Sequence, residues 1–121
     1  MALVLRQTVI DCLDPSAVAA FWGDALGWEV KHEETYLWMS ESGADDSFGA
    51  VLVFVPVPEP KAGKNRVHID LAVRRSNQAT EVARLLKLGA VPVDVGQGDR
   101  PWVVLADPEG NEFCVEPVDL R

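Results

Sequence analysis

Hydrophobic residues recur along this chain with two periods, one of two residues and one of about 3.6. Runs with the shorter period predict four strands in the first half, over residues 4–12, 28–33, 36–40 and 49–57. Between the first two runs, Val18, Phe21 and Trp22 recur at helical spacing. Asp14 supplies an N-cap before this helix, and Gly27 supplies a C-terminal stop. The first half is therefore predicted to form a strand, a helix and three strands.

The second half repeats this order. Strands are predicted over residues 66–73, 91–95, 101–105 and 112–117, and a helix over residues 77–88. Val82 and Leu85 lie on the inward face of that helix, and Gly89 ends it. A turn over residues 107–111 joins the last two strands, because Pro108 suits the second turn position and Gly110 tolerates positive φ.

The two halves are related by a nearly constant offset. Leu26 and Gly27 recur as Leu88 and Gly89, 62 residues later. The stretch between the halves is rich in proline and glycine and predicts a linker. We therefore expect an α+β fold in one domain, residues 1–121, made of module one (1–57), a linker (58–65) and module two (66–121). Two βαβββ modules would form a curved eight-stranded mixed sheet around a concave cavity, with the helices outside.

Composition narrows the classes of partner. The 121 residues carry 11 Lys and Arg against 19 Asp and Glu, a formal net charge of −8. A chain this acidic repels phosphate backbones and anionic lipid, which argues against nucleic-acid and membrane partners. No apolar stretch is long enough to span a bilayer or to form a signal peptide, so we expect a cytoplasmic protein. The two cysteines, Cys12 and Cys114, predict no disulfide framework.

Four short motifs carry a resemblance to a known family. They are Gln7-Thr8 with Asp14-Pro15, Ala20-Phe21-Trp22 with Leu26-Gly27, Arg66-Val67-His68-Ile69-Asp70, and the run from Asp107 through Pro108, Glu109, Gly110, Asn111 and Glu112 to Phe113. With them the chain resembles the glyoxalase and bleomycin-resistance group of the vicinal oxygen chelate superfamily. The resemblance implies paired βαβββ modules around a concave site, a small-molecule ligand and a homodimer.

The resemblance also implies positions for a metal site. Metal-dependent relatives place one ligand on the first and fourth strands of each module, which here correspond to Gln7, Val53, His68 and Cys114. Val53 has no donor atom, and Cys114 stands where relatives place a Glu. A divalent metal is possible on Gln7, His68 and Cys114 but is not favoured. A dioxygenase is less favoured still, because oxygen-activating iron takes two His and one carboxylate.

Strand parity adds acidic residues to the inward face. If His68 and Cys114 point inward, then Asp70, Glu112 and Glu116 do so as well, and Asp11 follows from Gln7. His68, Asp70 and Glu116 are the candidate catalytic groups, because a His beside carboxylates can move protons near neutral pH. The structural alternative is that these carboxylates only pair with Arg66, Lys64 or backbone amides near the strand ends.

Tryptophans and a cysteine complete the candidate ligand-binding set. Trp38 and Trp102 lie on predicted strands, where an indole can stack on a flat or cationic ligand. Gln7, Val53 and Cys114 join them from the family positions. Cys114 is more readily explained as a packing residue than as a nucleophile.

These observations favour a glyoxalase-like protein that binds a small molecule with a degenerate or absent metal site, sequestering a drug or metabolite. The alternative is a divalent-metal-dependent lyase or isomerase of the same superfamily. A third possibility is a purely structural domain whose cavity is filled by its own side chains.

Overall fold

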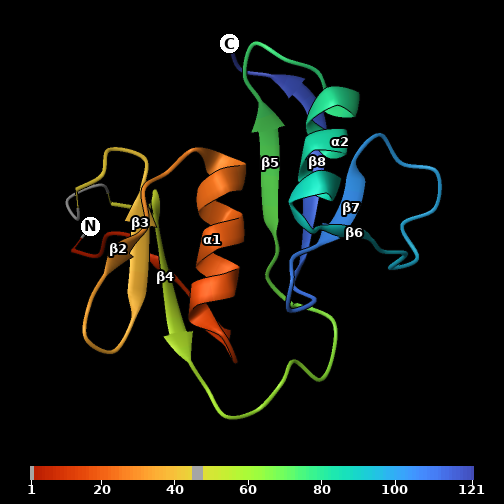
Figure 1. The fold of residues 1–121 in the computed structure, drawn as a ribbon. Coiled ribbons are helices and arrows are strands. Elements are labelled where there is room, and N and C mark those ends of the chain that lie inside the picture. The colour runs from red at the N-terminus through yellow and green to blue at the C-terminus, as the bar shows by residue number, and fades with distance from the viewer. Residues whose placement is uncertain (1, 45–47) are drawn as a thin grey trace. The chain divides into compact units, whose positions relative to one another are not determined.

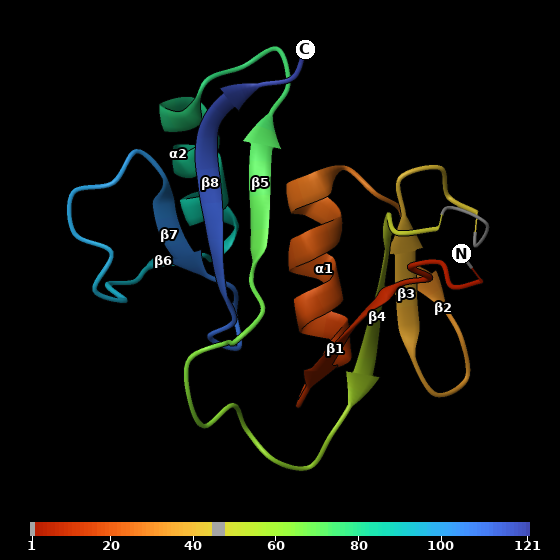
Figure 2. The same ribbon diagram turned by 180° about the vertical axis from the view of Figure 1, so that it is seen from behind.

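The computed structural model describes residues 2–44 and 48–121. Residues 45–47, which lie between the strands predicted over residues 36–40 and 49–57, are outside the described residues. The chain divides into two compact units, Met1–Pro60 and Lys61–Arg121. From here on, module one and module two denote these units, so that the residues of the predicted linker are shared between them. Each contains one helix and a four-stranded mixed sheet in the order βαβββ (Figures 1 and 2). The predicted α+β fold built from two such modules is confirmed.

Module one comprises β1 (Thr8–Cys12), α1 (Pro15–Leu26), β2 (Lys31–His32), β3 (Leu37–Ser40) and β4 (Val51–Pro56). Its strands lie in the order β1-β4-β3-β2. The β1–β4 pair is parallel and the other two pairs are antiparallel. The parallel pairing is possible because α1 and the following hairpin return the chain to the starting end of the sheet.

The ends of α1 and its buried face explain why this segment is helical. The Asp14 carboxylate accepts a hydrogen bond from the Ala17 N–H at 3.2 Å, and Gly27 ends the helix in the left-handed conformation with φ 71°. On the inner side, Trp22 is fully buried, as are Met39 and Phe54 of the sheet. Burying side chains of this size contributes roughly 1.5–3 kcal/mol each.

Module two comprises β5 (Ile69–Val73), α2 (Gln78–Leu88), β6 (Val91–Pro92), β7 (Val103–Ala106) and β8 (Glu112–Asp119). Its strand order, β5-β8-β7-β6, is that of module one. α2 begins at the N-cap Asn77, whose side chain accepts from the Thr80 N–H at 2.9 Å, and ends at Gly89. α2 packs along β8, and Leu85 is its buried residue (Figure 1).

The predicted turn between β7 and β8 has a buried anchor. The Asp107 carboxylate is 2% exposed and accepts from the N–H groups of Glu109 and Asn111 at 2.9 and 3.0 Å. Gly110 adopts φ 87°, which other residues rarely adopt. These bonds fix the point at which β8 starts, and hence which of its residues face each side of the sheet.

The strands differ from the predicted ranges mainly at their ends. β1 begins at Thr8 rather than at residue 4, and Leu3, Val4 and Leu5 are exposed. The alternation of hydrophobic and polar residues marks a segment that can form a strand, but only Thr8–Cys12 lie opposite β4 and pair with it. At the other extreme, β8 continues past Pro117 to Asp119. The β5–β8 register shifts there, since Leu71 pairs with Val115 and Val73 with Asp119.

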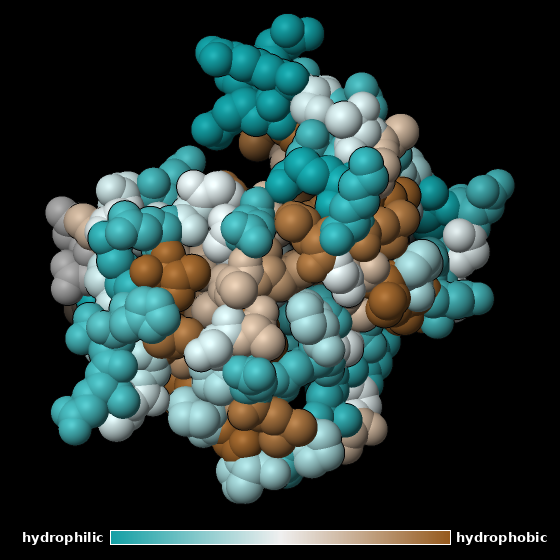
Figure 3. Space-filling model, viewed as in Figure 1, coloured by the Kyte–Doolittle hydropathy of each residue, from teal (hydrophilic) through white to brown (hydrophobic). Residues whose placement is uncertain are grey.

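No helix within the described residues is long and apolar enough to cross a membrane. On the face shown in Figure 3, hydrophobic atoms form separate patches among hydrophilic side chains.

Candidate functional site

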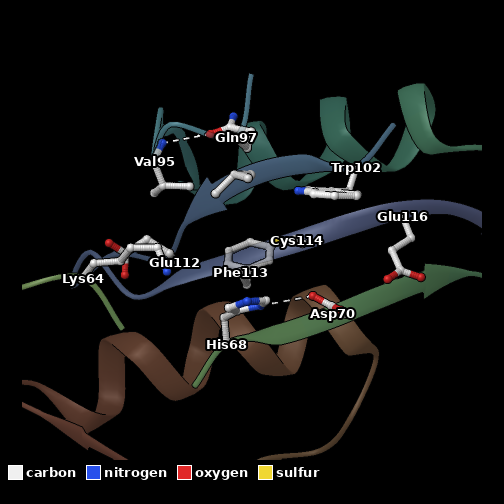
Figure 4. Close-up of a pocket in the computed structure, with 11 residues that line it drawn as sticks. Lys64, His68, Asp70, Val95, Gln97, Trp102, Glu112, Phe113, Cys114 and Glu116 are labelled. Carbon is white, nitrogen blue, oxygen red and sulfur yellow. Dashed lines mark hydrogen bonds and ion pairs between the residues drawn. The ribbon is translucent and has the colours of Figure 1, made fainter. Parts of the chain in front are cut away.

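A cavity of about 390 Å³ lies on module two (Figure 4). Its size is within the range of small-molecule sites, roughly 300–1,000 Å³. All of its lining residues come from the segment between Lys64 and Glu116. The wall includes Trp102, Val104 and Phe113, and the polar groups include His68, Asp70 and Glu116. The site is therefore an apolar pocket with a small set of ionisable groups.

Sheet register explains why these residues meet. Cys114 of β8 is paired with Asp70 of β5 on one side and with Val104 of β7 on the other. Alternation along β8 places Glu112, Cys114 and Glu116 on the same face of the sheet. Phe113 and Val115 are buried and alternate with these residues.

His68, Asp70 and Cys114 form the closest cluster of polar groups. Nδ1 of His68 lies 3.2 Å from Oδ1 of Asp70, and one donor atom from each of the three residues lies within 4.8 Å of the others. Because a carboxylate accepts, Nδ1 of His68 is the donor in this contact, and Nε2 is left for other partners. The Cys114 thiol also forms a hydrogen bond with Asp70.

The environment of Cys114 keeps its sulfur protonated. Burial raises the pKa of the thiol, and the negative charge of Asp70, the hydrogen bond to Asp70 and the charge of Glu116 raise it further. A thiol of this kind is a poor nucleophile at neutral pH. Cys114 therefore acts as a small, partly apolar wall of the pocket and as a hydrogen-bond donor to Asp70.

Glu112 lines the pocket but is fixed by its neighbours. Lys61 Nζ lies 3.1 Å from its carboxylate, and the Asn65 N–H donates to Oε1 at 2.9 Å. Burial alone would raise the pKa of Glu112, but the Asn65 hydrogen bond and Lys61 outweigh it, so the pKa is lowered. Glu112 therefore joins the segment before β5 to the start of β8.

Glu116 and Trp102 occupy the other end of the pocket. The Glu116 side chain is half-buried and makes no hydrogen bond or ion pair with any other residue that the structure describes. Trp102 is 38% exposed, and the Arg100 guanidinium lies 5.9 Å from its ring centroid. Both groups are therefore accessible to a ligand.

Sequence reasoning missed Gln78, the first residue of α2. Its Nε2 donates to the carbonyls of Pro101 at 2.8 Å and Val115 at 2.9 Å. These carbonyls immediately precede Trp102 and Glu116. A polar residue after a helix N-cap is common, so no local pattern marks this role. Lys64, Val95 and Gln97, which also line the pocket, were not predicted as site residues either.

The structure brings together His68, Asp70, Trp102, Cys114 and Glu116 of the predicted site residues. Trp38 and Val53 are cross-strand neighbours in module one, where the Trp38 Nε1–H donates to Glu33 at 3.1 Å. Gln7 directly precedes β1 and is exposed, as is Asp11. The participation of these module-one residues in a ligand or metal site stays a prediction.

The donor set of module two can be compared with what a metal ion requires. Imidazole, carboxylate and thiolate are ordinary zinc ligands, and three of them leave a fourth position open. Hard ions such as Mg²⁺ and Mn²⁺ prefer sets of oxygen ligands, which His68 and Cys114 do not supply. His68, Asp70 and Cys114 therefore suit zinc, provided that the Cys114 thiol loses its proton.

Solved structures of several proteins resemble this chain in fold. One is the fosfomycin resistance protein FosX from Listeria monocytogenes, solved with Mn(II) and a dihydroxypropylphosphonic acid, with TM-score 0.69, 12% identity and coverage of 99% of this chain and 93% of that one. A possible glyoxalase from Bacillus cereus gives TM-score 0.64 and 15% identity over 95% and 99% of the two chains. A glyoxalase/bleomycin resistance protein/dioxygenase family enzyme from Burkholderia phytofirmans gives 0.62 and 16% over 93% and 97%.

No curated protein sequence matches the chain significantly. A family model, by contrast, spans nearly the whole chain. It describes the glyoxalase-like domain and matches residues 7–116, from the residue before β1 to the Glu116 carboxylate in the pocket. The chain belongs to the glyoxalase-like domain family.

Proposed function

We propose that this chain binds a small organic molecule in the module-two pocket without a metal ion, and thereby sequesters a drug or metabolite. The observation that carries the proposal is the pairing of the would-be metal ligands with one another. Asp70 accepts from both His68 and the Cys114 thiol, whose pKa is raised by burial and by nearby carboxylates. An ion would have to displace these hydrogen bonds and the thiol proton.

The residue at the fourth family position supports the same function. Val53 is buried between β1 and β3 and offers no donor atom. The module-two pocket, in contrast, has the apolar walls and few polar groups that are typical of small-molecule sites.

A zinc-dependent lyase or isomerase is the second candidate, favoured by the proximity of three donor atoms within 4.8 Å. His68, Asp70 and Cys114 would hold the ion, which as a Lewis acid would stabilise negative charge on a substrate oxygen. Glu116 lies in the same pocket and has no hydrogen-bond or ion-pair partner among the described residues, so its carboxylate would move the proton.

Elemental analysis of protein purified without chelators separates the two candidates. The metal-independent function predicts less than stoichiometric metal and no rise in thermal midpoint with zinc, nickel, manganese or iron. Stoichiometric metal that is lost in His68→Ala would overturn it and support the enzyme. A thermal-shift screen of small molecules tests binding itself, because a cavity that serves only structure binds none of them.

We also propose a homodimer, since the edges of open sheets need protection. Light scattering after size exclusion at micromolar concentration should give about twice the 13.2 kDa of one chain. A mass of one chain would contradict the proposal.

A further inference from the structure

We propose that the module-two pocket selects organic cations: a protonated amine placed by Asp70 and Glu116, attached to a planar apolar group that lies against Trp102. This inference rests on the proposed small-molecule function and names the class of ligand.

The charges around the pocket favour a cation. Three carboxylates line it, those of Asp70, Glu112 and Glu116, against the single ammonium of Lys64. Glu112 is neutralised by Lys61 at 3.1 Å, and Lys64 Nζ donates to the Asn65 carbonyl at 3.1 Å. Asp70 and Glu116 remain without a Lys or Arg partner among the residues that the structure describes. Two carboxylates in a partly apolar pocket repel an anion and attract an ammonium.

The two carboxylates act on the same region of the pocket. The negative charges of both raise the pKa of the Cys114 thiol, which lies between β5 and β7 in the sheet. In Figure 4 the Glu116 side chain points from β8 toward Asp70 on β5. Both carboxylates therefore act on a cationic group that enters this part of the pocket.

Trp102 supplies the apolar half of the recognition. Its indole lines the pocket and is 38% exposed. The face of an indole attracts cations and stacks on planar groups. Val104, which precedes Leu105 on β7 and pairs with Cys114, continues the apolar wall. A ligand with an ammonium at one end and a ring at the other matches this arrangement.

Three probes with the same naphthalene ring and substituents of similar size test the charge requirement: 1-naphthylmethylammonium, the neutral 1-naphthylmethanol and the anion 1-naphthoate, each titrated calorimetrically into the full chain. The ammonium should bind at least about tenfold more tightly than the alcohol, and the carboxylate more weakly than either. Raising the salt from about 50 to about 500 mM should weaken binding of the ammonium only.

Variants locate the effect. Glu116→Gln and Asp70→Asn should each weaken the ammonium about fivefold and leave the alcohol unchanged, as expected for partly exposed ion pairs. Trp102→Leu should weaken both probes, and Trp102→Phe should restore most of the loss. Glu34→Gln, which removes an exposed carboxylate in module one, is the matched control and should change neither affinity. Unchanged thermal midpoints exclude unfolding as the cause.

Equal affinity for the ammonium and the alcohol would overturn the selectivity while leaving small-molecule binding intact. Tighter binding of the carboxylate would overturn it as well. Binding of none of the three probes would also overturn it, and the thermal-shift screen then decides separately whether the pocket binds small molecules at all.

Discussion

The two modules share one backbone plan but differ in the side chains of their parallel strand pairs, β1 with β4 and β5 with β8. Val9 pairs with Val53 in module one, and 61 residues later Asp70 pairs with Cys114 in module two. The same offset relates the residues on one face of β4 and of β8, which are Val51, Val53 and Val55 in the first and Glu112, Cys114 and Glu116 in the second. The shared fold fixes where the site can lie, and substitutions on one face of one module give it chemistry.

The modules also differ in the regularity of their parallel pairs. β1 and β4 pair without interruption from Thr8 to Cys12, whereas the β5–β8 register shifts between Leu71 and Val73. Glu116 lies directly after the last regular pair, Leu71 with Val115. Irregularities of this kind often redirect a side chain next to a functional site. Gln78 holds the Val115 carbonyl at that point.

Removing a buried phenylalanine ring from the core should have the largest effect on stability. Comparing one such variant in each module separates the loss of stability from the loss of ligand binding. Phe54→Ala in module one and Phe113→Ala in module two each delete a side chain that is at most 1% exposed. Each should lower the free energy of unfolding by about 3–5 kcal/mol, measured by urea denaturation. Only Phe113→Ala should also abolish binding of 1-naphthylmethylammonium at temperatures where the variant is folded. Equal loss of binding in both variants would contradict a site confined to module two.

Replacing Gln78 should remove the support of the irregular pairing. Gln78→Ala leaves the carbonyls of Pro101 and Val115 without their shared donor and should cost about 1–3 kcal/mol of unfolding free energy. Affinity for the ammonium probe should fall as well, because Trp102 and Glu116 follow these carbonyls in the chain. Gln78 acts on the ligand only through them.

A neighbouring substitution on the same helix turn is the control for Gln78. Thr80→Ala removes an exposed side chain and should change stability by no more than about 0.5 kcal/mol. If Gln78→Ala matched Thr80→Ala in both stability and probe affinity, Gln78 would have no positioning role.

Local signals and tertiary signals account for what the sequence could and could not predict. The sequence predicts α1 and α2 to within a residue, because Asp14, Gly27 and Gly89 are capping signals that act over one turn. The sequence does not locate the start of β1 at Thr8, because alternation does not reveal which residues have a partner strand beside them.

The residues of the candidate site also fall into those that a local pattern predicts and those that only tertiary contacts reveal. Parity and the repeat were enough to place His68, Asp70, Cys114 and Glu116 on one face, since strand alternation is a local rule. Gln78 escaped prediction because its role depends on carbonyls 23 and 37 residues away in the chain. Nor could the sequence separate Glu112 from Glu116, because only the fold shows that Lys61 and Asn65 meet the former.

Removing the N-cap of the helix should have the same effect on stability in both modules and no effect on binding. The two modules would then differ in their sheet faces but not in their helix caps. Asp14→Ala and Asn77→Ala each remove a side-chain acceptor from a first-turn N–H, at Ala17 and Thr80 respectively. Each should cost about 1 kcal/mol of unfolding free energy, measured by urea denaturation. Neither should alter the affinity for the ammonium probe. A cap variant that weakens binding would show that the helix ends, and not only the sheet face, determine the site.

Acid should remove a small stabilisation that the ionised Glu112 carboxylate gives to module two. Module one lacks it, because the residue at the corresponding position, 61 residues earlier, is Val51. The pKa of Glu112 is lowered from an ordinary value of 4.5 by the Asn65 hydrogen bond and Lys61, against the effect of burial. A carboxyl with a lowered folded pKa stabilises the fold above its unfolded pKa, and this contribution disappears as the pH falls through the folded value. Glu112→Gln should therefore cost about 0.5–1 kcal/mol of unfolding free energy at pH 7 and almost nothing well below pH 4.5, measured by urea denaturation across that range.

The control is Glu34→Gln, which changes an exposed carboxylate that has no such partners among the described residues. It should show no pH-dependent difference from the wild type. If the cost of Glu112→Gln stayed constant on acidification, the stabilisation would come from the shape and packing of the Glu112 side chain and not from its negative charge.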